Sequence, residues 1–237
     1  MKNVTVLNDL HLGVQRCAGT TPASAQALRD WLLDSYAEFI NTLPDDETLL
    51  LNGDVFDAGQ PGFSTLQAFV KLTSEWVSQG TRRVFMSRGN HDIDRSGAPS
   101  GFDFSGSILG LLCGDRVTVV TKPTAFEYGY VIPHLANQDI LDQALLDVPP
   151  GCYVFLHTNV NCPFSAQHDH SLSVSRNQIE ALIAQGNTLV FAHDHRPREE
   201  FGGKVIVTGC FLPTSVGDCL GSKFKHALRL EVLDGEI

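Results

Sequence analysis

The sequence predicts an α/β protein, in which β-strands and α-helices alternate and pack in layers. Short runs of consecutive apolar residues, which are typical of strands buried on both faces, alternate with longer stretches whose apolar residues have helical spacing. Five of the expected strands are followed directly by short polar motifs that contain Asp, Asn or His. Because open α/β sheets place their sites at the carboxyl ends of the strands, we expect these motifs to converge on one point.

The first half of the chain has a regular order of strands and helices. Apolar residues at helical spacing predict helices at 22–43 and 64–79, and Gly80 is placed to end the second helix. Apolar runs predict strands at 4–7, 48–51 and 83–86.

The second half is less regular. Expected strands lie at 117–120 and 125–132, both assigned to a second sheet, and at 152–156, 188–191 and 226–233. Expected helices lie at 107–113, 139–146 and 175–185, and Ser175 with Gln178 predicts a capping box at the start of the last one. Residues 199–201 and 204–208, separated by Gly202 and Gly203, predict a hairpin. Residues 159–172 form the least regular loop.

Composition indicates a single folded domain that spans residues 1–237. With 43% hydrophobic and 19% charged residues, the chain can bury a full core. Its six cysteines form no Cys-x-x-Cys pair, so we expect free thiols. The net charge of −10 argues against binding nucleic acid through a broad basic surface, although divalent cations can reverse the charge locally.

The sequence gives no indication of a membrane partner. It contains no apolar run long enough to span a bilayer. The apolar run at the N-terminus is too short for a signal peptide. We therefore expect a cytoplasmic protein.

The five motifs carry most of the functional information. They are Asp9-Leu10-His11, Gly53-Asp54-Val55-Phe56-Asp57, Gly89-Asn90-His91-Asp92, His157-Thr158 and His193-Asp194-His195. Each motif alone is readily explained as a turn or a partly buried histidine. All five together, each after an apolar strand, indicate a metal site. Asp, Asn and His donors suit Mn, Fe or Zn better than Ca or a thiolate-bound ion.

The order of these motifs resembles that of the calcineurin-like metallophosphoesterase superfamily, from Asp9 to the last strand. The resemblance implies two mixed β-sheets packed as a sandwich between helices, with two divalent metal ions at the strand ends. Mn²⁺ is the metal we expect, with Fe or Zn as alternatives. The residues that resemble ligands of one ion are Asp9, His11, Asp54 and His195; those that resemble ligands of the other are Asp54, Asn90, His157 and His193.

The same resemblance assigns roles to two further residues. His91 resembles the family's histidine near the leaving group, and Asp92 resembles the residue that orients it. A paired metal site lowers the pKa of water and binds phosphate oxygens, and His91 can then act as a general acid. The chain has Ala192 where the family usually has Gly, which fits if the backbone there does not need a positive φ.

The residues of the first, second and last motifs resemble those of the nuclease branch, which includes the double-strand-break repair exonuclease subunit. We therefore expect a metal-dependent phosphodiesterase that hydrolyses DNA or another nucleic acid. The alternative is a phosphomonoesterase acting on a small molecule, nucleotide or phosphoprotein. A non-enzymatic scaffold is disfavoured, because every ligand position is filled.

Partners and substrate contacts follow from the same comparison. No capping domain or helical tail is evident, so we do not expect an SMC-like ATPase partner; a homodimer is left open. Arg88 and Arg196 are the candidate substrate-binding residues. Further side chains considered near the substrate are Arg198, Lys223, Lys225, His168 and His170, with solvated positions as the simpler interpretation.

Overall fold

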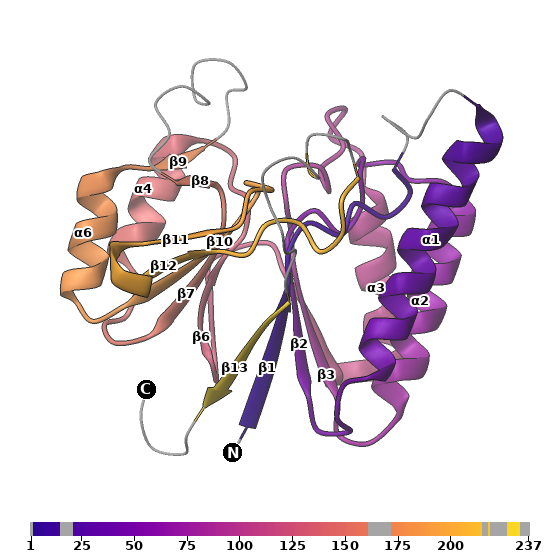
Figure 1. The fold of residues 1–237 in the computed structure, drawn as a ribbon, viewed down its shortest axis with the longest axis horizontal. Helices are drawn as coiled ribbons and strands as arrows, with labels where there is room; N and C mark the ends of the chain where they lie inside the picture. Colours follow the sequence, from indigo (N-terminus) through magenta and orange to yellow (C-terminus); the bar gives the residue numbers. More distant parts are fainter. Residues whose placement is uncertain (1, 15–20, 161–171, 215–217, 219–226, 233–237) are drawn as a thin grey trace.

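The computed structural model describes residues 2–14, 21–160, 172–214, 218 and 227–232. Two large mixed sheets pack against each other, with helices on both outer faces (Figure 1). This arrangement confirms the expected fold class. In the described part of the chain, no helix is long and apolar enough to cross a membrane.

The first sheet has the strand order β13-β1-β2-β3-β4. Its strands are β1 (Lys2–Leu7), β2 (Thr48–Asn52), β3 (Arg83–Ser87), β4 (Val117–Val120) and β13 (Leu228–Val232). Strands β1 to β4 are parallel, and β13 pairs antiparallel with β1. The assignment of 117–120 to the second sheet was therefore wrong. Those residues form β4, which follows a helix that crosses from β3, as parallel neighbours require.

Three helices cover the outer face of the first sheet: α1 (Pro22–Asn41), α2 (Phe63–Ser78) and α3 (Gly101–Cys113) (Figure 1). The expected start of α3 at residue 107 was six residues too late. Ser100 and Asp103 form a capping box in which each side chain binds the other's backbone N–H. Helix α3 leads into the short 3-10 turn η1 (Gly114–Arg116) before β4.

The second sheet has the order β11-β12-β10-β7-β6-β5. Its strands are β5 (Thr124–Phe126), β6 (Gly129–Ile132), β7 (Tyr153–His157), β10 (Thr188–Ala192), β11 (Arg198–Glu200) and β12 (Val205–Val207). The expected single strand at 125–132 is a hairpin, because the chain turns back at Glu127 and Tyr128. The predicted hairpin of β11 and β12, joined by η2 (Phe201–Gly203), is confirmed.

Helices α4 (Gln138–Leu146) and α6 (Arg176–Ala184) cover the outer face of the second sheet (Figure 1). The predicted capping box at the start of α6 is confirmed, with Ser175 as its first residue. Strands β8 (Asn159–Val160) and β9 (Ser173–Val174) form a small separate sheet. Most of the loop expected at 159–172 lies outside the described residues.

Apolar side chains from both large sheets form the central core. Val4, Val6 and Leu50 from the first sheet belong to one buried cluster with Phe155 and Val190 from the second. This packing fixes β1 and β2 relative to β7 and β10, and these four strands precede four of the five motifs. The cysteines that the structure describes, Cys113, Cys152 and Cys210, are free thiols as expected; Cys17, Cys162 and Cys219 lie outside the described residues.

Candidate metal centre

The strand ends bring all seven predicted metal ligands together. Strands β1, β2, β3, β7 and β10 end at Leu7, Asn52, Ser87, His157 and Ala192, and each predicted ligand lies at such an end or in the segment that follows it. Four of the ligands, Asp9, His11, Asp54 and His157, are buried, and the other three are partly buried. Buried carboxylates require a charged or hydrogen-bonding partner. A cation would supply one.

The first group of donor atoms belongs to Asp9, His11 and His195, whose ligand atoms lie within 4.8 Å of one another. The Nε2 atoms of His11 and His195 are 3.1 Å apart. Two nitrogens bound to one ion at about 2.0–2.1 Å in tetrahedral geometry have nearly this separation. The residues therefore fit a metal ion at this position.

The second group belongs to Asp54, His157 and His193. The amide oxygen of Asn90 lies 2.9 Å from His157 Nε2 and 2.9 Å from His193 Nδ1. His157 Nδ1 lies 3.1 Å from the carbonyl oxygen of Asn52. Because a carbonyl can only accept, the proton is on Nδ1, and Nε2 is left to bind a metal.

Asp54 connects the two groups. Its Oδ1 lies 3.4 Å from His157 Nε2, and its Oδ2 lies 3.8 Å from His11 Nε2. Burial alone would raise the pKa of Asp54, but the nearby histidines outweigh it and hold the pKa well below its ordinary value. Asp54 is therefore an ionised carboxylate placed to serve both groups, which is the geometry that a bridging ligand needs.

The backbone is strained at four of the seven predicted ligands. Asp9, His11, Asp54 and His193 have φ values of 52°, 47°, 47° and 80°. L-residues rarely adopt this region, which costs on the order of 1–3 kcal/mol per residue and is concentrated at functional sites. Ala192 is not among the residues with positive φ, so the departure from the family's glycine is accommodated, as expected.

Asp92 connects the backbone of two loops of the site. Its buried carboxylate accepts backbone N–H groups from Gly89 at 2.8 Å, Phe56 at 2.9 Å and Val55 at 3.2 Å. It thus ties the loop after β2 to the loop after β3. Burial and the charge of Asp54 raise the pKa of Asp92 to about 7. The expectation that Asp92 orients the ring of His91 stays a prediction.

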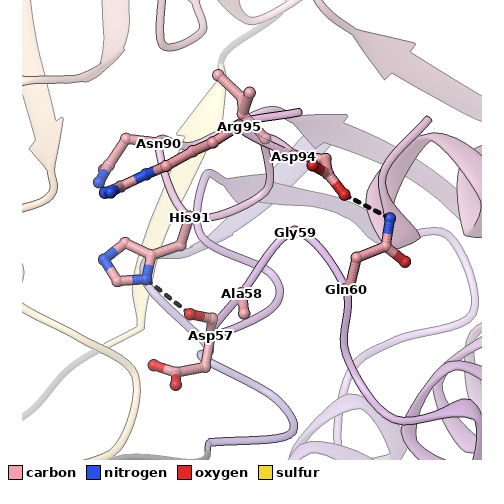
Figure 2. A pocket seen from close by; sticks show the side chains of 9 residues that line it. Asp57, Ala58, Gly59, Gln60, Asn90, His91, Asp94 and Arg95 are labelled. Atoms are coloured by element: carbon pink, nitrogen blue, oxygen red, sulfur yellow. Dashed lines mark hydrogen bonds between the residues drawn. The ribbon is translucent and has the colours of Figure 1, made fainter. Parts of the chain in front are cut away.

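The ring of His91 is held by the backbone of the second motif. Its Nδ1 lies 2.7 Å from the carbonyl oxygen of Asp57 (Figure 2). Nδ1 therefore carries the proton of that hydrogen bond, and Nε2 is the atom that can exchange a proton with a substrate. The ring centroids of His91 and His11 are 5.0 Å apart, which places His91 beside the first group of donors.

A cleft of about 510 Å³ opens on this side of the site (Figure 2). It is lined by Asp57, Ala58, Gly59, Gln60, Asn90, His91, Ile93, Asp94 and Arg95. Its volume is within the range of small-molecule pockets. His91 and Asn90 belong both to this cleft and to the cluster of predicted site residues, so a substrate in the cleft can reach them.

The predicted substrate contacts have different surroundings. Arg88 Nη2 lies 3.4 Å from the carbonyl oxygen of Thr121, and Arg88 Nε is buried with no hydrogen-bond partner among the described residues. The Arg196 side chain is exposed and 3.7 Å from Asp194. Arg198 is held by Asp194 at 2.6 Å and by Glu200 at 2.7 Å, which argues against a phosphate contact. Lys223, Lys225, His168 and His170 lie outside the described residues.

Several residues of the site were missed in the sequence. Asn8 donates to the carbonyl of Phe191 at 3.0 Å and to Thr208 at 2.7 Å, which fixes the end of β1 to the second sheet. His134 lies beside His157, with ring centroids 6.4 Å apart. Burial and the charge of His157 lower the pKa of His134 to about 4. Asn8 directly precedes the first motif, so the sequence could have indicated its role. His134 lies in none of the five motifs, so no local pattern in the sequence indicates that it belongs to the site.

Gly53 offers a direct test of the packing around His157. Gly53 has a φ of 86°, and a Cβ at this position would overlap the His157 ring. Gly53→Ala is therefore expected to lower the free energy of unfolding by about 1–3 kcal/mol, measured by urea denaturation.

Gly110 is the matched control, because a Cβ there meets no atom of the described residues within 4 Å and Gly110 lies inside α3. Gly110→Ala should leave stability unchanged or raise it by about 0.5–1 kcal/mol. Equal effects of the two substitutions would show that His157 is not closely packed against Gly53.

Comparison with known families identifies one match. The sequence model described as calcineurin-like phosphoesterase matches residues 2–209. Members of this family normally bind two divalent metal ions, and the Asp and His clusters described above fit such a site. No curated protein matches the sequence.

Solved structures with a similar fold include a putative 5'-nucleotidase from Staphylococcus aureus, determined in complex with alpha-ketoglutarate. It is 16% identical, with a TM-score of 0.50, and the match covers 88% of this chain and 48% of the nucleotidase. The chain thus spans about half the length of that protein. Phosphopantetheinyl hydrolase from Mycobacterium tuberculosis is 12% identical, with a TM-score of 0.46 and coverage of 87% of both chains. A novel archaeal phosphodiesterase is 11% identical, with a TM-score of 0.42 and coverage of 96% of this chain and 98% of its own.

Proposed function

Since the chain belongs to the calcineurin-like phosphoesterase family, we propose that it is a metal-dependent phosphodiesterase. The observation that supports this proposal most is the position of Asp54. One ionised carboxylate faces both groups of donor atoms, and a two-metal hydrolase needs such a residue. Mn²⁺ is the proposed metal, with Fe and Zn as alternatives, because the donors are nitrogen and oxygen atoms.

The residues of the chain have separable tasks in this reaction. The two cations, when bound, supply positive charge for the phosphate oxygens and lower the pKa of water. Asn90 contributes a neutral oxygen, which preserves positive charge for an anionic substrate. His91 holds a proton at Nε2 while the Asp57 carbonyl fixes Nδ1, so that it can protonate the departing oxygen.

The proposed substrate is a phosphodiester in a short or frayed single strand of nucleic acid, or in a nucleotide. The resemblance of the first, second and last motifs to those of the nuclease branch supports a nucleic-acid substrate. The net charge of −10 disfavours tight binding along a long duplex. The cleft of about 510 Å³ beside His91 has the size of a small-ligand site rather than of an extended groove.

A phosphomonoesterase remains the second candidate, and Arg88 is the observation that favours it. The buried Nε of Arg88 has no hydrogen-bond partner in the part of the chain that the structure describes. Arg88 directly precedes the Gly89-Asn90 motif, and its backbone carbonyl accepts the N–H of His134. A guanidinium near the site could compensate the second negative charge of a monoester.

Hydrolysis assays in Mn²⁺ distinguish the two candidates. Bis-p-nitrophenyl phosphate should be cleaved faster than p-nitrophenyl phosphate, and short single-stranded DNA faster than intact duplex. Cleavage of DNA should weaken as salt is raised, because phosphate contacts are screened. The Asp54→Asn protein, purified in parallel, controls for contaminating nucleases. Robust cleavage of the monoester with no cleavage of any DNA or RNA would favour the phosphatase.

A further inference from the structure

We propose that Asp218 positions His195 for metal binding. The inference rests on the proposed function, since it takes His195 to be a ligand. Asp218 Oδ1 lies 2.8 Å from His195 Nδ1, and the carboxylate is buried. Asp218 lies outside the five sequence motifs and beyond residue 209, where the match to the family ends. It is therefore a feature of this chain that the family match does not include.

Asp218 is itself held in place. Its second oxygen, Oδ2, accepts the backbone N–H of Thr214 at 2.9 Å and is 3.1 Å from the Thr214 hydroxyl. Both carboxylate oxygens thus have defined partners. A carboxylate fixed in this way can hold an imidazole in one orientation, whereas a solvated one would exchange between rotamers.

The bond to Asp218 determines which nitrogen of His195 meets the metal. A carboxylate at Nδ1 keeps the proton there and leaves the lone pair on Nε2. His195 Nε2 is the atom that lies 3.1 Å from His11 Nε2 in the first group of donors. The carbonyl of Asn52 holds Nδ1 of His157 in the same way in the second group. Each group therefore contains a histidine whose Nδ1 is held and whose Nε2 faces the donors.

His195 depends on such a partner more than His157 does. The His195 side chain is 26% exposed, whereas that of His157 is fully buried. A partly exposed ring has more freedom to turn, so the loss of its anchor should affect one ion selectively. The buried thiol of Cys210 lies in the same cluster as His195 and Asp218.

Metal titrations of the full-length protein without substrate test this role. Mn²⁺ binding to the unchanged protein, Asp218→Ala and Asp218→Asn is measured by calorimetry and by electron paramagnetic resonance. Asp218→Ala should weaken the binding of one of the two ions by about 10–100-fold and leave the binding of the other unchanged. Asp218→Asn should recover most of the affinity, because its amide oxygen can still accept from Nδ1.

Asp194→Asn is the matched control. Asp194 lies between His193 and His195 in the sequence, but its carboxylate pairs with Arg198 at 2.6 Å. This substitution should leave both affinities unchanged. If Asp218→Ala does not fold, Asp218→Asn is compared with Thr214→Val. This substitution removes the hydroxyl beside Asp218 Oδ2, so it should weaken the binding of the same single ion.

The proposal is overturned if the Asp218 variants bind both ions with the affinity of the unchanged protein, or if the affinity for both ions falls equally. It is also overturned if Asp218→Asn is as damaging as Asp218→Ala, since an accepting oxygen would then be irrelevant. A failure of the proposed function looks different: the unchanged protein would bind two ions and hydrolyse no phosphodiester.

Discussion

Asp54→Asn is expected to abolish most metal binding and reduce hydrolysis to near background. The two carboxylate oxygens lie 3.4 Å from His157 Nε2 and 3.8 Å from His11 Nε2, so a single charge serves both groups of donors. An amide of the same shape removes that charge from both at once. Its oxygen can still accept the backbone N–H of His91, which Asp54 Oδ1 now accepts at 2.8 Å, so the fold should be retained.

Metal content by mass spectrometry and the rate in Mn²⁺ measure this effect, and circular dichroism verifies folding. Asp46→Asn is the matched control, because Asp46 is an exposed carboxylate just before β2. That variant should bind metal and react like the unchanged protein. Two ions bound to Asp54→Asn at the original affinity would refute the bridging role.

His91→Ala is expected to keep the bound metal and to lose roughly 10²–10⁴-fold in rate, which is the usual contribution of general acid catalysis. The ring is held at Nδ1 by the Asp57 carbonyl at 2.7 Å and lines the cleft, which leaves Nε2 for the substrate. The loss should be smallest for p-nitrophenyl esters, because a good leaving group departs without a proton.

A series of leaving groups of increasing pKa, assayed with and without the substitution, measures this role. The penalty for losing His91 should grow with the pKa of the leaving group. A constant penalty would argue against proton donation. Loss of metal from His91→Ala would instead make His91 a ligand, since its ring also lies in a cluster with His11 and Asp57.

The sequence was most informative where a pattern is local. Apolar runs located β1, β2, β3, β7 and β10, because strands that are buried on both faces have nearly continuous apolar sequences. The motifs after these strands predicted which side chains meet, because parallel strands share one edge. The positive φ values of Asp9, His11, Asp54 and His193 could not be predicted, since tertiary contacts impose them.

Pairing and long-range contacts were the weak points. The run at 117–120 was recognised as a strand, but its sheet depends on the length of the preceding helix, whose capping box with Asp103 was missed. The turn inside 125–132 lacks Pro and Asn and has a glycine only at its end. Asp218 and His134 are single polar residues outside any motif, and only the folded chain shows that they adjoin His195 and His157.

Anomalous diffraction from crystals soaked in Mn²⁺ tests the two-metal site most directly. We expect two peaks at the ends of β1, β2, β7 and β10, about 3.5–4 Å apart, with Asp54 between them. His11 and His195 should bind one ion through Nε2, and His157 and Asn90 should bind the other. Diffraction that shows no metal at these residues, together with no metal in the purified protein, would contradict the central claim.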